Sequence, residues 1–163
     1  MSTNMFAKFG DIKGESEDQA HPDWCEITSV EQDFTQKASP TEESKPDTCK
    51  VEHSEIKISK DIDEASTGLM KACWEATRLK KVEIECFRAD GQNDPIKYFN
   101  IVLEDVIIHK FEYKGSGDGS IIGEDLELVA AKATYTYRAM DKKLGTAGGR
   151  MIASHDLKNN VIT

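Results

Sequence analysis

Short runs of alternating apolar and polar residues, separated by turn-forming clusters, constrain the fold of this sequence more than any other feature. The clearest run places Val82, Ile84 and Cys86 on one face of a strand and Glu83 and Glu85 on the other. A period of two residues is typical of a strand with one buried face. Strand-like runs occur at residues 5–12, 24–34, 51–59, 82–88, 96–108, 126–137 and 151–157. The pattern predicts a mainly β chain.

Three glycine-containing clusters predict hairpins between neighbouring runs. Asp90-Gly91 separates the fourth run from the fifth, and this dipeptide is typical of a tight β-hairpin. Residues 114–119 and 145–149 mark two further connections. Short strands joined in this way favour a sandwich or a barrel. We therefore expect a β-barrel of two sheets, sandwich-like in form.

One segment has helical rather than strand periodicity. Ser66 or Thr67 is expected to cap its start. Its apolar residues then recur at i, i+3, i+4 and i+7, namely Leu69, Ala72, Cys73 and Ala76. Such a stripe predicts a single α-helix that packs onto the sheet or across one end of the barrel.

The segment 35–50 differs from the rest of the chain. It contains two prolines, several serines and threonines and charges of both signs, but no bulky apolar residue. A segment of this composition cannot bury a face of its own. We expect a long, exposed, extended loop.

Size and charge limit the classes of protein. The chain has 163 residues, which predicts one domain over 1–163. Its 30 acidic and 21 basic side chains give a formal net charge of −9. A surface of that sign repels phosphate backbones and anionic lipids, so nucleic acid is not an expected partner.

Targeting features are also absent from the sequence. No apolar run approaches the roughly 18 residues of a membrane-spanning helix, so no membrane insertion is expected. The first eleven residues lack the basic and apolar regions of a Sec-type signal peptide. We expect synthesis in the cytoplasm, with any export by another route.

The search for catalytic chemistry gives no candidate. The glycine-rich segment 115–120 lacks the lysine and the following helix of a phosphate-binding loop. Ser154, His155 and Asp156 are adjacent on a strand, where neighbours point to opposite faces and cannot converge. His21 is expected in a turn rather than as a base. The sequence predicts a protein that is not an enzyme.

Cofactor and metal sites are not predicted either. The four cysteines form no CxxC pair, and no histidine lies at metal-ligand spacing from a cysteine. Cys73 and Cys86 lie in apolar patterns and are expected to be buried. Trp24 and Trp74 are expected in the core rather than on a ligand-binding surface.

Several motifs together resemble the Hcp family, the haemolysin-coregulated tube proteins of bacterial type VI secretion. The first is residues 5–16, with the sequence MFAKFGDIKGES, followed by His21 and by WCEI at 24–27. Both the order and the spacing of these motifs resemble those of the Hcp family. The resemblance continues through 58–63, 66–73, 82–88, 98–106 and 124–137.

The resemblance implies a β-barrel of two sheets with one flanking helix. It further implies six-fold rings of this chain that stack into a tube, the inner part of a contractile injection machine. The implied partners are other copies of the chain, the spike protein, the sheath and small effector proteins held in the lumen. The subunit itself is implied to be exported.

Self-assembly of this kind requires two contacts. Edge strands with unpaired backbone groups can join neighbouring copies, and a head-to-tail contact of suitable rotation closes into a ring. Stacking needs a protruding element, and our hypothesis assigns it to the loop 35–50, the alternative being a mobile loop with no partner. The candidate stacking residues are Gln36, Lys37, Pro40, Glu43, Lys45 and Asp47.

Two other functions remain open at this point. One is a monomeric β-sandwich binding module, which would purify as a monomer. The other is an adaptor or chaperone that holds a secreted cargo without forming tubes and oligomerises only with that cargo.

Overall fold

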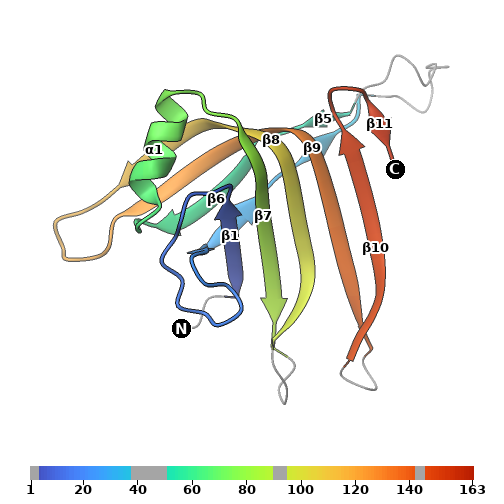
Figure 1. Cartoon of the computed structure of the whole chain (residues 1–163), viewed down its shortest axis with the longest axis horizontal. Coiled ribbons are helices and arrows are strands. Elements are labelled where there is room, and N and C mark those ends of the chain that lie inside the picture. The colour runs from blue at the N-terminus through green and yellow to red at the C-terminus, as the bar shows by residue number, and fades with distance from the viewer. Residues whose placement is uncertain (1–3, 38–50, 90–94, 142–145) are drawn as a thin grey trace.

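The computed structural model describes residues 4–37, 51–89, 95–141 and 146–163 (Figure 1). Within these ranges the chain forms eleven strands and one helix. The elements are β1 (Met5–Phe9), β2 (Cys25–Glu26), β3 (Ser29–Glu31), β4 (Phe34–Thr35), β5 (Glu52–His53), β6 (Ile56–Asp61), α1 (Ser66–Trp74), β7 (Leu79–Arg88), β8 (Ile96–Lys114), β9 (Gly123–Asp141), β10 (Thr146–Asp156) and β11 (Val161–Ile162).

Strand β9 connects the two layers of the fold. One of its edges pairs with β8 from Gly123 to Tyr137. Its other edge pairs with β6 as far as Leu128 and with β10 from Lys132 onward. One layer therefore has the order β11-β10-β9-β8-β7-β1-β2. In the other layer, β6 pairs with the first part of β9, and β3 pairs with β6. Figure 1 shows β6 lying behind the row β7–β10 and crossing it.

The predicted fold class, mainly β with two sheet layers and one flanking helix, is confirmed. Every strand pair is antiparallel. The described strands form an open order rather than a closed ring of hydrogen bonds, so the sandwich-like description fits better than a complete barrel.

The core lies between the layers. Strand β7 buries Val82, Ile84 and Cys86, as the alternation predicts, and leaves Glu83 and Glu85 partly exposed. A fully buried large apolar side chain stabilises the fold by about 1.5–3 kcal/mol. Other fully buried core residues are Phe9, Ile27, Ile58, Leu69, Leu103, Leu126 and Leu128.

The run 24–34 does not form the single strand that was predicted. The Ile27 amide donates to the Met5 carbonyl at 3.1 Å, whereas the next amide, of Thr28, donates to the Ser59 carbonyl at 2.8 Å. The chain thus changes partner from β1 to β6 as it passes between layers. This exchange divides the run into β2, β3 and β4.

The three predicted hairpins connect the expected strands. Strands β7 and β8, β8 and β9, and β9 and β10 pair as antiparallel neighbours. The turn residues at 90–94 and 142–145 lie outside the described residues. Strand β10 begins at Thr146, inside the connection predicted for 145–149.

The hairpin formed by β8 and β9 is longer than predicted. Its strands continue past Ile108, beyond the runs 96–108 and 126–137, to Lys114 and Gly123. Most residues of this extension of β8 are exposed, so the extension shows no alternation of buried and exposed positions. The extension forms an arm that projects to one side of the molecule (Figure 1).

The helix α1 starts without the predicted cap. Its N-cap position is Ala65, and neither Ser66 nor Thr67 caps it. Instead, the Asp63 carboxylate accepts the Ala65 amide at 2.9 Å, and the Ser66 hydroxyl accepts the Asp63 amide at 2.9 Å. A turn stabilised by two side chains thus precedes the helix.

The helix packs against β8 through part of the predicted stripe. Leu69 and Ala72 are buried and Cys73 is half-buried, but Ala76 lies beyond the helix. The prediction that Trp74 is in the core is wrong, because its side chain is 78% exposed. Trp74 follows Leu69 by five residues, which places it about 140° around the helix from the buried face. No helix among the described residues is long and apolar enough to cross a membrane.

Candidate assembly site

The two-stranded ribbon β4–β5 forms the base of the predicted stacking loop. Gln36 and Lys37 follow β4 directly and are exposed. The Lys37 ammonium lies 2.8 Å from the carboxylate of Glu52 in β5, across the ribbon. The chain therefore leaves and returns at one fixed place. The other four candidates, Pro40, Glu43, Lys45 and Asp47, lie outside the described residues.

Two histidines attach this ribbon to β10. His53 Nε2 lies 2.9 Å from His155 Nδ1, and His155 Nε2 lies 3.1 Å from Asn160 Oδ1. An amide oxygen only accepts, so His155 donates through Nε2 and accepts at Nδ1 from His53. With both rings neutral, this chain of hydrogen bonds is complete. Burial, and then the charge of His155, lower the pKa of His53.

Aromatic side chains pack around the histidine pair. The Phe34 ring contacts the rings of His53 and Tyr135 edge to face, with centroids 4.7 and 5.5 Å apart. Together with Ile162, they line an apolar pocket of about 200 Å³. The base of the loop is thus held by apolar packing and neutral hydrogen bonds.

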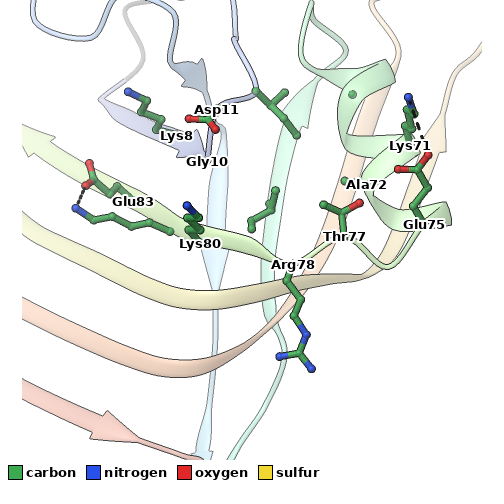
Figure 2. A pocket seen from close by; sticks show the side chains of 14 residues that line it. Lys8, Gly10, Asp11, Lys71, Ala72, Glu75, Thr77, Arg78, Lys80 and Glu83 are labelled. Carbon is green, nitrogen blue, oxygen red and sulfur yellow. Dashed lines mark ion pairs between the residues drawn. The ribbon is translucent and has the colours of Figure 1, made fainter.

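A larger groove lies between α1 and β7 and has a volume of about 610 Å³ (Figure 2). Lysines and carboxylates share its rim, and Lys71 pairs with Glu75 at 4.0 Å. Figure 2 shows the Arg78 side chain pointing away from the helix, where its guanidinium contacts Asp105 at 2.8 Å. The groove offers a polar surface of mixed charge for contact with another molecule.

The structure keeps the three adjacent triad-like residues apart. Ser154 Oγ lies 3.1 Å from Thr134 Oγ1. His155 faces His53, whereas the Asp156 carboxylate accepts from the amide of Asn159. Among the described residues, no three His, Cys, Asp or Glu side chains are placed to hold a metal ion.

A buried ionic network, which sequence reasoning missed, joins the two layers to the helix. Lys60 Nζ lies 2.5 Å from Glu124 Oε1 and 2.8 Å from Asp63 Oδ1, and it donates to the Asp61 carbonyl at 2.8 Å. The Lys60 and Glu124 side chains are fully buried. The signal was present in the sequence, because Lys60 occupies the next inward position after Ile58 in the alternation of β6.

His21 has a second structural role within the motif segment. It lies in the predicted turn, but it is also buried and stacked on Phe6, with ring centroids 4.4 Å apart. Its ring nitrogens lie 2.8 Å from Asp18 Oδ2 and 2.7 Å from Glu85 Oε2. The hydrogen bond from His21 lowers the pKa of Asp18. His21 thus ties the segment after β1 to β7.

Comparison with known proteins agrees with this architecture. The family model described as "Type VI secretion system effector, Hcp" matches residues 6–142. The chain belongs to the Hcp family. Its resemblance to Hcp in sequence motifs is therefore confirmed as a family relationship.

Two curated proteins of Pseudomonas aeruginosa are similar to this Hcp chain. Protein hcp1 is 26% identical over 161 residues, which covers 99% of each chain. The Major exported protein is 31% identical over 103 residues, which covers 59% of this chain and 57% of the relative.

Solved structures of Hcp proteins share the fold. Hcp1 from Salmonella typhimurium superimposes with a TM-score of 0.81 at 25% identity, over the full length of both chains. A protein described as a type six secretion system protein gives a TM-score of 0.89 at 21% identity and covers 99% of this chain and 100% of its own.

Proposed function

We propose that this Hcp chain is the structural subunit of a type VI secretion inner tube. Copies of the chain form six-fold rings, and the rings stack into the tube. The observation that carries the proposal is the match in fold and family over nearly the whole chain. The single domain over 1–163 is then the repeating unit of the tube.

Ring formation follows from the open borders of the fold. The sheet ends at short strands, β11 at one border and β2 at the other. Unpaired backbone groups at such borders are available to a neighbouring copy. A head-to-tail contact between two different borders closes into a ring when its rotation divides the circle evenly.

Stacking is assigned to the loop whose base is the β4–β5 ribbon. The ribbon is held by the Lys37–Glu52 ion pair and by the contact between His53 and His155. These contacts fix where the loop leaves the molecule, which reduces the entropy lost when the loop docks on the next ring. Gln36 and Lys37 lie at its start as exposed polar residues.

The proposed role is structural and requires no catalysis or cofactor. The assembled tube contacts the spike protein and the sheath, and its lumen holds small effector proteins. The tube subunit is exported with its cargo. The description of one relative as a major exported protein supports this part of the proposal.

Deleting residues 36–47 tests the stacking role. Four residues, 48–51, remain to connect Thr35 to Glu52, enough for a short hairpin loop. Rings of unchanged size are expected, without tubes, in negative-stain electron microscopy. A variant in which 36–47 are replaced by a Gly-Ser segment of equal length controls for loop length. Tubes of wild-type length after the deletion would remove the stacking role.

A further inference from the structure

A pocket of about 230 Å³ lies on the face of β8, β9 and β10 that points away from the core. Three of its lining residues are cationic, namely Lys97 of β8, Arg138 of β9 and Arg150 of β10. Tyr135 packs against the core, so Arg138, three positions further along the strand, faces the other way. The pocket lies where β8 begins and β9 ends, at the lower end of this row of strands in Figure 1.

The other lining groups of this pocket are neutral. Asn100 and Thr136 are cross-strand partners in the neighbouring row and add an amide and a hydroxyl. The lining, as the structure describes it, contains no Asp or Glu. The groove between α1 and β7 differs, because lysines and carboxylates share its rim. In a chain of net charge −9, this one pocket has the composition of an anion site.

The two arginines face each other across the sheet. Arg138 and Arg150 are direct cross-strand partners on β9 and β10. Like charges in directly opposite positions repel each other and destabilise a sheet. No carboxylate within the described ranges forms an ion pair with either arginine. An anion bound between the two guanidinium groups would offset this repulsion.

Arg138 also has a donor available for such an anion. Its side chain is half-buried, and its Nε–H is buried without a hydrogen-bond acceptor among the described residues. Buried donors in proteins nearly always have a partner, so an unpaired one calls for an explanation. An acceptor oxygen supplied by another molecule would satisfy this donor.

The charges at the edge of the pocket do not cancel those of the arginines. The Lys97 ammonium lies 3.2 Å from Glu85 Oε1, and Glu85 Oε2 lies 2.7 Å from the His21 ring. Glu85 is therefore held by these two partners. The Arg88 guanidinium lies over the Tyr98 ring, 4.9 Å from its centroid, and adds another cation at this end of the sheet.

We propose that Arg138, Arg150 and Lys97 form a binding site for the phosphate oxygens of a diphosphate-type anion. A guanidinium group binds phosphate through two parallel N–H donors, and two such groups here face one pocket. Several cations match an anion of two or more negative charges better than a single carboxylate. This site goes beyond the proposed tube function and does not depend on it.

Calorimetric titration of the purified chain with inorganic pyrophosphate tests the site. R138Q and R150Q should each weaken binding by about tenfold or more, because each removes charged hydrogen-bond donors. R138K keeps the charge but loses the planar fork, and it should weaken binding as well. R78Q is the matched control, since Arg78 is exposed, pairs with Asp105 and lies outside this pocket, so its affinity should equal that of the wild type.

Thermal unfolding gives a second readout, independent of the heat of binding. Without ligand, R150Q should unfold at the same temperature as the wild type or higher, because it removes one of two facing like charges. Pyrophosphate should raise the midpoint of the wild type but not that of R138Q/R150Q. A marked fall in the midpoint of ligand-free R150Q would show a structural role for Arg150 and overturn the proposal.

The source of the phosphate group is resolved by a second ligand. ADP presents the same diphosphate with a nucleoside attached. Tighter binding of ADP than of pyrophosphate would support a larger phosphorylated molecule, and the reverse order would support the free anion. Binding of neither ligand, or equal affinity of the wild type and R138Q for pyrophosphate, would overturn the proposal. Rings formed by the wild type in the same sample would show that the tube function stands regardless.

Discussion

His53 and His155 contact each other through ring nitrogens, with 2.9 Å between His53 Nε2 and His155 Nδ1. The contact joins the β4–β5 ribbon, at the base of the predicted stacking loop, to β10, which lies far along the chain. His155 also donates to Asn160, which leaves only an acceptor nitrogen facing His53. Burial and the neighbouring His155 make protonation of His53 costly in the folded chain, so the stability of the fold depends on pH.

The stability of the fold should decrease as pH falls below 6.5, the ordinary pKa of histidine. The pKa of His53 is lowered in the folded chain, by burial first, so the unfolded chain binds a proton there more readily. The contribution of neutral His53 to the free energy of unfolding is complete above pH 6.5. It is lost as pH falls toward the lower pKa that His53 has in the folded chain. Urea unfolding at several pH values between 7.5 and 5.5 measures how steeply the free energy of unfolding falls with pH.

The variant H53Q is the control for this prediction. Its side-chain amide can still donate to His155 but does not titrate. The free energy of unfolding of H53Q should fall less steeply over the same range. Equal slopes for the variant and the wild type would contradict the role assigned to His53.

Replacing Lys60 by methionine should strongly destabilise the chain. The substitution leaves Glu124 and Asp63 without the cation that bridges them in the interior. Removing one partner of a buried ion pair costs about 3–5 kcal/mol of unfolding free energy. The double variant K60M/E124L removes both charges and should lose less. A midpoint of urea unfolding unchanged in K60M would show that the network is not needed for stability.

Gly14 should not tolerate a side chain. A Cβ at this position would lie 2.6 Å from the Trp24 carbonyl carbon and 2.8 Å from the Cys25 amide nitrogen, which are backbone atoms that cannot rotate away. We expect G14A to lose about 1–3 kcal/mol of unfolding free energy. G117A is the matched control, because a Cβ there meets no atom within 4 Å. Equal stability of the two variants would disprove the close approach at Gly14.

Much of the fold could be predicted from the sequence because burial imposes a period of two on its strands. Val82, Ile84 and Cys86 in β7 show this directly. The rule was less useful at 24–34, where the chain changes partner between layers. Partner exchange depends on the position of β6, which lies far along the sequence and leaves no local pattern.

The candidate sites were only partly accessible to the same reasoning. Composition indicated the exposed loop, and Gln36 and Lys37 lie at its base as exposed residues. The contact between His53 and His155 joins residues 102 positions apart, so no spacing rule could find it. Trp74 was misassigned because residue type alone favours burial, while its helical position faces away from the core.

The stacking of rings should strengthen as salt rises from low to physiological concentration. Each chain carries a net charge of −9, so stacked rings repel one another. The screening length shortens from about 30 Å at 0.01 M to about 8 Å at 0.15 M salt, which weakens that repulsion. Light scattering of tubes should increase over this range. A decrease would mean that attractive ion pairs dominate the contact between rings.

The mass of the purified chain in solution tests the central claim most directly. We predict a species of about six times the 18.2 kDa of one chain by light scattering after size exclusion, visible as a hollow ring in negative stain. A mass of one chain at high protein concentration would contradict the account.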